Sequence, residues 1–416
     1  MNITYVCYFF PPEVSAAAAG VYDNAVRLVR MGHRVTVLTG LPNNPRGRLF
    51  PGYRVRPLTV ETMDGLRVVR VASWFRPNTS AARRLTSYGS LMASQILAAR
   101  FGERPDVVVG SSPPLFQAFA GLAVARLNRC PFVMEVRDLW PENMVAIGAL
   151  RNGAGLRMLT ALERLLYRRA ARIVAVTQGF KDYIVSKGVA AERVEVVTNG
   201  VDLDLYRVVA YPEILARELG LFGKFVAGYI GTVGINHGLQ TMIDAAERLR
   251  DDPDVVLMIV GDGAERPALE RQAAQRGLTN IRFLGERGRN EMPEYHALCD
   301  AMLVLLKDSP YFHRVIPSKV FVGMGMAKPI ILGVDGEARA ILEDARAGVF
   351  VPPENVDAVV DAVRRFKALK SGDGLATMGA SGREYVRRHF DRDQLARSFE
   401  RALRTVAPSG SARSAG

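Results

Sequence analysis

The chain has 416 residues, of which 49% are hydrophobic and 23% charged, as in a globular protein long enough for two domains. No apolar run reaches the ~18 residues of a spanning helix, so we predict that nothing crosses a membrane. The net charge of +13 lies mostly in residues 1–205, which hold 26 Lys/Arg against 15 Asp/Glu, whereas residues 206–416 hold 29 against 27. This asymmetry predicts an anionic partner, and because no aromatic and basic RNA motif occurs, nucleic acid is the least favoured one.

The three cysteines, Cys7, Cys130 and Cys299, show no C-x-x-C spacing. This pattern predicts free thiols in a reducing cytoplasm, without a disulfide framework or a zinc site. The first ten residues are apolar but have neither a basic leader nor a cleavage site, so they indicate a first strand rather than a signal peptide.

Residues 2–9 predict a buried strand that Pro11-Pro12 ends, and a loop of small residues, 15–20, should follow. An amphipathic helix then runs to Gly32, and a strand is expected over 34–38. A βαβ unit of this kind places its first turn where open α/β sheets bind ligands. Ser15, Ala16 and Gly20 are therefore candidate ligand-binding residues, and an ordinary turn of such a fold is an equal alternative.

Residues 53–60 and 66–72 alternate in the manner of strands, and a helical run should extend from residue 81 to residue 101. This run follows Trp74-Phe75-Arg76-Pro77 and mixes arginines with apolar residues at helical spacing. It is either a basic amphipathic element on a bilayer or a helix packed on the sheet, which is the commoner use of such a stripe. Because the whole N-terminal half is basic, we favour membrane contact.

A predicted strand over 131–136 ends in the hexapeptide Arg137-Asp138-Leu139-Trp140-Pro141-Glu142. Charged and aromatic residues at the C-terminal end of a strand indicate a site, and a surface loop with salt bridges is the alternative. The other elements expected in this half are strands over 106–110, 172–176 and 194–198 and helices over 115–127, through 156–167 and from 179, before the turn at 199–202.

A second domain should begin after a helix at 212–219, with a first strand over 225–231. The loop 231–238 is rich in glycine, and strand-to-helix loops of this kind can cradle phosphates. Its spacing is not G-x-G-x-x-G, so a dinucleotide fingerprint is not supported. Gly231, Thr232, Gly234 and His237 are the candidates, although a lone histidine is usually structural.

The stretch 316–331 predicts a helix start, a short helix and a buried strand, with Ser318 as N-cap and Pro317 keeping the preceding chain extended. Lys319 falls in the first turn, where a cation is unfavourable against the helix dipole unless an anion sits there. The alternative is an ordinary exposed lysine that buries little. Farther on, Gly336 and Glu337 begin another helix, and helices are expected over 355–369, 378–389 and 394–406.

These segments resemble motifs of the retaining family 4 glycosyltransferases, in the branch similar to N-acetyl-L-fucosaminyl transferases (WbuB-type). The resemblance lies in residues 8–13, 32–40, 137–142, 199–202, 231–239 and 333–341, and in the donor-site positions Pro317, Ser318, Lys319, Phe321, Met324, Lys328, Pro329 and Ile330.

The chain departs from the family pattern at several positions. The glutamate that accepts hydrogen bonds from the nucleotide ribose is replaced by Val322, and the earlier glutamate of the pair falls on Arg314. The first loop carries alanines and has no arginine near Gly20, and the 231–238 loop lacks the Arg and Lys of other members. Lys319 thereby gains importance, and Glu337 is a candidate substitute for the ribose carboxylate.

The resemblance implies an α/β fold of the GT-B type, with two Rossmann-like domains facing each other across a cleft. The N-terminal acceptor domain would span 1–205 and the nucleotide-sugar domain 206–389. A helix over 390–406 would cross back to the first domain, and the tail 407–416 would be disordered.

The resemblance also implies roles for single residues. Arg137 and Asp138 are the expected catalytic residues. Donor-binding residues would be Gly231, Thr232, Gly234, His237, Ser318, Lys319, Val322, Gly336 and Glu337, and acceptor-binding residues Ser15, Ala16, Gly20, Trp140 and Glu142. No metal or cofactor is expected.

The implied activity is retaining transfer of a sugar, such as N-acetyl-L-fucosamine or a related N-acetylhexosamine, from a UDP-linked donor to a polyprenyl-diphosphate-linked acceptor. The expected place is the inner face of the cell membrane, with peripheral attachment to its anionic surface. Val322 modestly favours a rival interpretation, a catalytically impaired relative that serves as a scaffold for another transferase. A sugar-nucleotide 2-epimerase is a second rival, but the 137–142 loop lacks the acid and base set that it needs.

Overall fold

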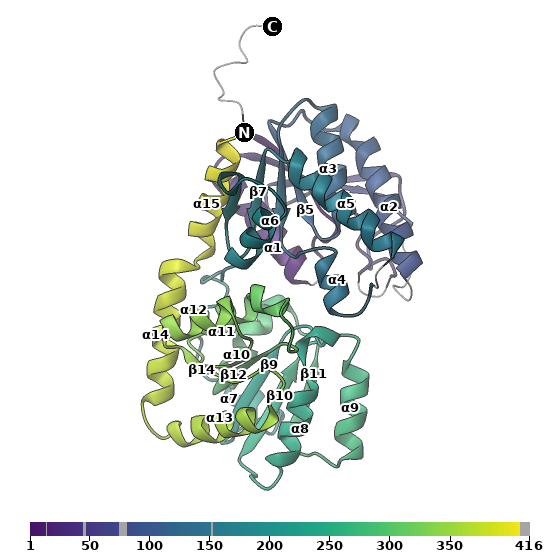
Figure 1. The fold of residues 1–416 in the computed structure, drawn as a ribbon. Coiled ribbons are helices and arrows are strands. Elements are labelled where there is room, and N and C mark those ends of the chain that lie inside the picture. The colour runs from purple at the N-terminus through teal and green to yellow at the C-terminus, as the bar shows by residue number, and fades with distance from the viewer. Residues whose placement is uncertain (14, 45–46, 75–80, 151–152, 408–416) are drawn as a thin grey trace. The chain divides into compact units, whose positions relative to one another are not determined.

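The computed structural model describes residues 1–13, 15–44, 47–74, 81–150 and 153–407 (Figure 1). By their contacts the residues form two compact units. Unit 1 is Met1–Thr198 together with Asp393–Gly416, and unit 2 is Asn199–Arg392. The division thus falls after Thr198, where we expected a boundary after residue 205. No helix in the described ranges is long and apolar enough to cross a membrane.

Unit 1 is built on an eight-stranded sheet in the order β3-β4-β2-β1-β5-β6-β7-β8. All neighbours are parallel except β3, which pairs antiparallel with β4 at the edge. Every residue of β5 and β6 is buried, as expected for strands covered on both faces. The strands are β1 Asn2–Val6, β2 Arg34–Gly40, β3 Leu58–Met63, β4 Leu66–Val71, β5 Val107–Ser112, β6 Phe132–Val136, β7 Arg172–Ala175 and β8 Val194–Val196.

The helices of unit 1 lie around this sheet, with α2, α3 and α5 side by side in Figure 1. They are α1 Ala16–Arg30, α2 Ala81–Ala98, α3 Leu115–Leu127, α4 Glu142–Ala146, α5 Ala154–Arg169, α6 Gln178–Ser186 and α15 Arg392–Arg404, with short 3-10 turns η1 Ala99–Phe101 and η2 Ala191–Arg193.

Two predicted boundaries in unit 1 are wrong. The expected loop 15–20 is the first turn of α1, because Ser15 caps the helix by accepting a hydrogen bond from the Ala18 N–H at 3.1 Å and four alanines follow. The strand expected from residue 53 begins only at Leu58 and runs to Met63.

Helix α15 belongs to the core of unit 1. Phe399, Ala402 and Leu403 are buried in the same cluster as the central strands, and the Phe399 ring stacks on Tyr5 at 6.2 Å between centroids. At its surface Glu400 accepts a hydrogen bond from the His33 ring at 2.8 Å.

Helix α2 uses its apolar stripe for packing, which is the second of the two expected uses. Tyr88 and Leu91 are buried, and α2 contacts α3, β2 and β4. Trp74 and Leu97 remain exposed, at 62% and 71%. Residues 75–77 of the preceding motif lie outside the described ranges.

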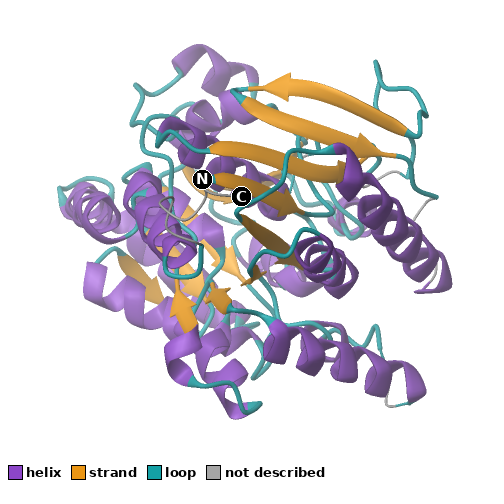
Figure 2. Cartoon of the chain, turned by 90° about the horizontal axis from the view of Figure 1, so that it is seen from above, coloured by secondary structure: helices purple, strands orange, loops and turns teal. Residues whose placement is uncertain are grey.

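Unit 2 is built on a six-stranded, wholly parallel sheet in the order β11-β10-β9-β12-β13-β14. In both units the strands lie next to one another among helices, as Figure 2 shows. The strands of unit 2 are β9 Phe225–Ile230, β10 Val255–Val260, β11 Ile281–Gly285, β12 Ala301–Leu305, β13 Ile330–Gly333 and β14 Gly348–Phe350.

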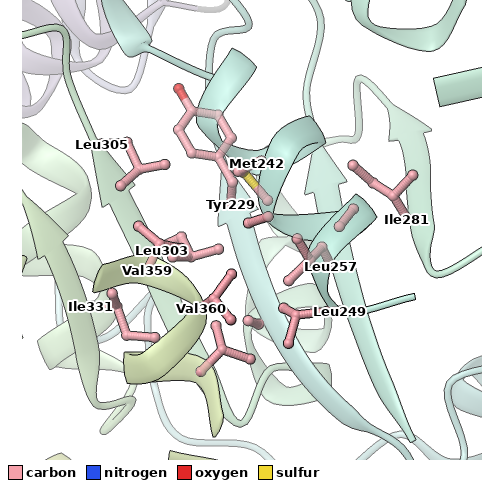
Figure 3. Packing of buried hydrophobic residues seen from close by; sticks show 14 of the residues in the cluster. Tyr229, Met242, Leu249, Leu257, Ile281, Leu303, Leu305, Ile331, Val359 and Val360 are labelled. Carbon is pink, nitrogen blue, oxygen red and sulfur yellow. The ribbon is translucent and has the colours of Figure 1, made fainter. Parts of the chain in front are cut away.

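The core of unit 2 lies between this sheet and its helices. Leu257 of β10 and Leu303 of β12, the strands on either side of β9, meet Met242 and Val359 from two helices in one buried cluster (Figure 3). The helical elements are α7 Glu213–Glu218, η3 Ile235–His237, α8 Gln240–Arg248, α9 Arg266–Gln275, η4 Arg289–Glu291, α10 Met292–Leu298, η5 Phe312–Arg314, α11 Ser318–Gly325, α12 Glu337–Ala345, α13 Val356–Leu369 and α14 Gly374–His389.

The predicted N-cap of α11 is wrong by one position. The cap is Pro317, which has an extended backbone, and Ser318 is the first helical residue. No side chain caps this helix end. Its first N–H groups are therefore not taken by a capping side chain, and this matters for the site below.

Candidate functional site

The first loop of unit 2 leaves β9 in a conformation that requires glycine. Gly231 has a φ of +145°, and its carbonyl lies so close to Gly261 that a Cβ there would approach it to 1.9 Å. The Val233 N–H then donates to the Asp262 carbonyl at 2.9 Å. Two glycine turns, one after β9 and one after β10, are thus packed against each other at the C-terminal ends of their strands.

Tyr229, Lys319 and His237 form a cluster beside this loop. The Lys319 ammonium donates to the Tyr229 hydroxyl at 2.5 Å and lies 3.8 Å from the ring centroid. The hydroxyl in turn donates to the Thr232 carbonyl at 2.6 Å. The His237 ring stands edge-on to Tyr229, with 6.0 Å between centroids. In Figure 3 the Tyr229 hydroxyl points away from the apolar core, so the tyrosine closes the core on the side where the lysine lies.

The electrostatics of this cluster are unusual. Burial lowers the pKa of Lys319 to about 7, so the alternative of an ordinary exposed lysine is wrong. Burial and, secondarily, the Lys319 charge lower the pKa of His237 to about 3, which keeps that imidazole neutral. No carboxylate of the described residues forms an ion pair with Lys319. The cluster therefore holds an ammonium without a counter-ion, next to a helix N-terminus.

Helix α11 presents a buried and a partly exposed face. Phe321 is fully buried and packs on Phe390 at 4.5 Å between centroids. Ser318, Lys319 and Val322 are only partly buried. Residues three and four apart are neighbours on a helix, so Val322 lies on the same face as the two polar residues. Its methyl groups thus border the cluster rather than the core.

The loop after β13 is also fixed by a glycine. Gly336 has a φ of +82°, and a Cβ there would come within 2.1 Å of the His313 carbonyl. Glu337 follows in the first turn of α12 and is partly buried. Hence α12 begins against η5, the turn that precedes the lysine helix.

A second polar cluster lies in unit 1, at the end of β6. Arg137 donates to Glu135 at 3.0 Å, and the two side chains are only 9% and 2% exposed. Glu135 also accepts from the Asn24 amide at 3.2 Å. The guanidinium of Arg137 lies directly on Gly20 of α1. Arg137 is therefore a largely enclosed cation with its own acid.

The remaining predicted residues of this loop have other contacts. Asp138 accepts a hydrogen bond from Asn143. Trp140 is 8% exposed and packs edge-on against Tyr88 at 5.8 Å, so core packing accounts for its presence.

Glu142 accepts from the Tyr183 hydroxyl at 2.6 Å. Near the start of α1, Ser15 is occupied as the helix cap, and Ala16 is exposed.

Among the predicted site residues, the structure brings Gly231, Thr232, Gly234, His237 and Lys319 together in unit 2. In unit 1 it brings Gly20 together with Arg137.

Sequence reasoning missed three participants, Tyr229, Glu135 and Asn24. Tyr229 and Glu135 sit inside apolar strands, where a polar residue at a buried position is the available signal, and Asn24 lies partly buried in an amphipathic helix.

Family models match most of the chain. Residues 15–200 match the Glycosyl transferase 4-like domain, and residues 224–368 match Glycosyl transferases group 1. Among the described residues, no group of three or more His, Cys, Asp or Glu is placed to hold a metal ion.

Individual relatives of the chain are also named as glycosyltransferases. The chain is 28% identical over 407 residues to the "Putative colanic acid biosynthesis glycosyl transferase WcaI" of Escherichia coli (strain K12), covering 95% of this chain and 98% of that protein. It is 26% identical over 352 residues to the GDP-mannose-dependent alpha-mannosyltransferase of Mycobacterium tuberculosis (strain CDC 1551 / Oshkosh), covering 85% and 84%.

Solved structures show the same fold. The Anabaena protein Alr3699/HepE in complex with UDP and glucose superimposes with a TM-score of 0.72 at 18% identity, over 97% of this chain and 100% of that one. Sucrose-phosphate synthase from Thermosynechococcus elongatus gives a TM-score of 0.75 at 16% identity, over 97% and 98%. On the two domain matches and this fold, the chain belongs to the family 4 glycosyltransferases with the GT-B fold.

Proposed function

We propose that the protein transfers a sugar, with retention, from a UDP-linked donor to a polyprenyl-diphosphate-linked acceptor in surface polysaccharide synthesis. N-acetyl-L-fucosamine or a related N-acetylhexosamine is the proposed sugar. Support comes from the name of WcaI, which refers to colanic acid, and from the UDP and UDP-glucose complexes of HepE. The mycobacterial relative is named for GDP-mannose, so GDP is the competing nucleotide in any test.

The observation that carries the proposal is the Lys319 ammonium without a counter-ion. An ammonium enclosed against Tyr229 is unfavourable until an anion joins it. A nucleotide diphosphate supplies that anion, and the uncapped start of α11 supplies N–H donors beside it. His237 is neutral and contributes a hydrogen bond rather than charge.

Chemistry at this cluster would act on the leaving group. As the bond between sugar and diphosphate breaks, negative charge grows on the diphosphate, and a fixed ammonium stabilises that charge more than it stabilises the ground state. Arg137 and Asp138 are the proposed catalytic residues of unit 1. We assign no protein nucleophile and no resident metal.

The acceptor side of the proposal rests on unit 1. Its excess of basic residues and the exposed Trp74 suit a peripheral protein on the anionic inner face of the cell membrane, where polyprenyl diphosphates reside. Ser15, Ala16, Gly20, Trp140 and Glu142 stay the predicted acceptor-binding residues, with Glu337 predicted near the ribose.

Calorimetry with UDP, GDP and the matching nucleotide sugars, each in EDTA, tests the donor half of the proposal. We expect UDP to bind without metal and more tightly than GDP, and a UDP-sugar to be consumed when a polyprenyl-diphosphate sugar is added. Binding that requires Mg²⁺ or Mn²⁺ contradicts the metal-independent site. Tight binding without any transfer or donor hydrolysis would instead favour the catalytically impaired scaffold.

A further inference from the structure

Gly20 occupies a place in α1 where glycine is unfavourable on local grounds. It follows four alanines in the interior of a 15-residue helix, and glycine destabilises a helix interior relative to alanine. The residue is buried and has ordinary helical backbone, so no turn requires it. A reason for the glycine must therefore come from its surroundings.

The surroundings are the guanidinium of Arg137. A Cβ built on Gly20 would lie 1.8 Å from Nη2, 2.3 Å from Cζ and 2.9 Å from Nη1 of that side chain. Three atoms of one planar group meet this point, so the guanidinium lies against the bare backbone of α1. Alanine in this position would therefore displace the guanidinium, which is the far end of the Arg137 side chain.

Glu135 holds the same guanidinium from the strand side. Its Oε1 accepts from Nη1 of Arg137 at 3.0 Å and from Asn24, one helical turn beyond Gly20, at 3.2 Å. Its Oε2 is buried and makes no hydrogen bond within the described part of the chain. Keeping such a carboxylate on a central strand is costly, and the retained ion pair fixes orientation rather than adding stability.

From this geometry we propose that Gly20 and Glu135 are positioning residues that form a socket for Arg137 and set the direction of its guanidinium for sugar transfer. The proposal rests on the proposed function, because it takes Arg137 as a catalytic side chain. It assigns Gly20 a role different from the acceptor contact predicted from the sequence: the residue is small so that Arg137 can lie on it.

The test is a double-mutant comparison of Gly20→Ala in two backgrounds. In the wild-type chain the new methyl displaces Arg137, so we expect kcat and kcat/KM for the UDP-sugar to fall together by about 10- to 100-fold, the cost of ångström-scale misplacement. In an E135Q/R137A background, which leaves neither charge buried alone, the same substitution should cause no further loss.

Thermal unfolding gives a readout that does not depend on catalysis. In the E135Q/R137A background, Gly20→Ala should raise the Tm by about 2–4 °C, because only the helix propensity changes. In the wild-type chain that gain should be absent. Gly89→Ala is the matched control: Gly89 lies inside α2, and a Cβ there meets nothing within 4 Å. This control should raise the Tm and leave turnover unchanged.

Glu135→Gln and Glu135→Ala complete the test. Glu135→Gln keeps an oxygen that accepts a hydrogen bond from Arg137, so this variant should retain more turnover than Glu135→Ala. The Tm of the two variants should be equal. If R137A loses turnover while G20A and E135A keep it, the socket is wrong although the catalytic role of Arg137 stands. If R137A itself keeps full turnover, the catalytic assignment of Arg137 fails, and the role of the socket in transfer fails with it. A gain in Tm from G20A in the wild-type chain would overturn the socket directly.

Discussion

The two units each enclose a cation, and they do so in opposite ways. In unit 1, Arg137 lies 3.0 Å from a buried carboxylate, and the pair is nearly inaccessible to water. In unit 2, Lys319 lies on the neutral ring of Tyr229, with no acid of the described chain paired to it. Burial accordingly lowers the pKa of Lys319 to about 7, whereas Arg137 has an acid partner in Glu135.

The difference indicates what each cation is for. The charge of a cation with its own acid is already compensated, and the ion pair fixes the orientation of the side chain. A cation without one is unstable alone and gains from an anionic ligand, so its value lies in binding. In the proposed reaction, Arg137 of unit 1 would therefore contribute a fixed orientation, and Lys319 of unit 2 would contribute charge.

Removal of Lys319 is expected to give the largest effect. Lys319→Ala should weaken UDP binding by about 1.5–3 kcal/mol, roughly 10- to 150-fold, the range for hydrogen bonds to charged groups. Lys319→Met separates charge from packing, because its chain still covers the Tyr229 ring. Calorimetry should show a similar loss for both variants. An unchanged affinity in either would remove the donor-site assignment and the contrast between the two cations.

The second effect is a pH dependence that only Lys319 should confer. A diphosphate binds the protonated amine, so above a pH of about 7 the empty site must take up a proton, and affinity should fall by at most tenfold per pH unit. The ligand should be a UDP-sugar, since a terminal phosphate has its own pKa near ~6. Lys319→Arg should flatten the profile, and a slope that survives in this variant would assign the titration to another group.

The same pKa predicts the stability of the empty protein. The pKa of Lys319 is lowered on folding from 10.5 to about 7, so between these values the unfolded chain binds more protons than the folded one. The free energy of unfolding should therefore rise with pH across this window, and the penalty should be complete below it. Lys319→Met removes the penalty, which denaturant titrations on both proteins can measure.

Much of the fold follows from sequence periodicity, but the chemistry of the site does not. The buried runs of β5, β6 and β9 and the stripe of α5 predict these elements within a few residues. The environment of Lys319 depends on Tyr229, ninety positions earlier, which no local pattern reveals. The start of α1 was mispredicted although Ser15 and four alanines are strong helix signals, because small residues after a first strand also suit a ligand loop.

Val322→Glu is expected to give a smaller gain. The new carboxylate would stand on the partly exposed face of α11, one turn from Ser318, where the family resemblance places a ribose ligand. Hydrogen bonds to the ribose hydroxyls should tighten UDP binding by about 0.5–1.5 kcal/mol. Val322→Gln keeps the size and removes the charge, so it should gain less. If Val322→Glu lowers the Tm and leaves affinity unchanged, the site does not hold the ribose at this helix.

The smallest contribution of any single residue is expected in membrane binding, where the basic surface of unit 1 can be compared with the surface of unit 2. Residues 1–205 carry most of the net charge, and each basic residue near an anionic surface contributes roughly 1 kcal/mol, screened within a Debye length. We expect co-sedimentation with anionic vesicles, release by salt, and little binding to neutral ones.

Trp74, exposed at 62%, should anchor the protein, so Trp74→Ala should weaken co-sedimentation. Ile214 of unit 2, exposed at 77%, is the matched control, and Ile214→Ala should have no effect. Equal partitioning to neutral and anionic vesicles, or equal losses in the two variants, would mean that the basic unit does not select the surface.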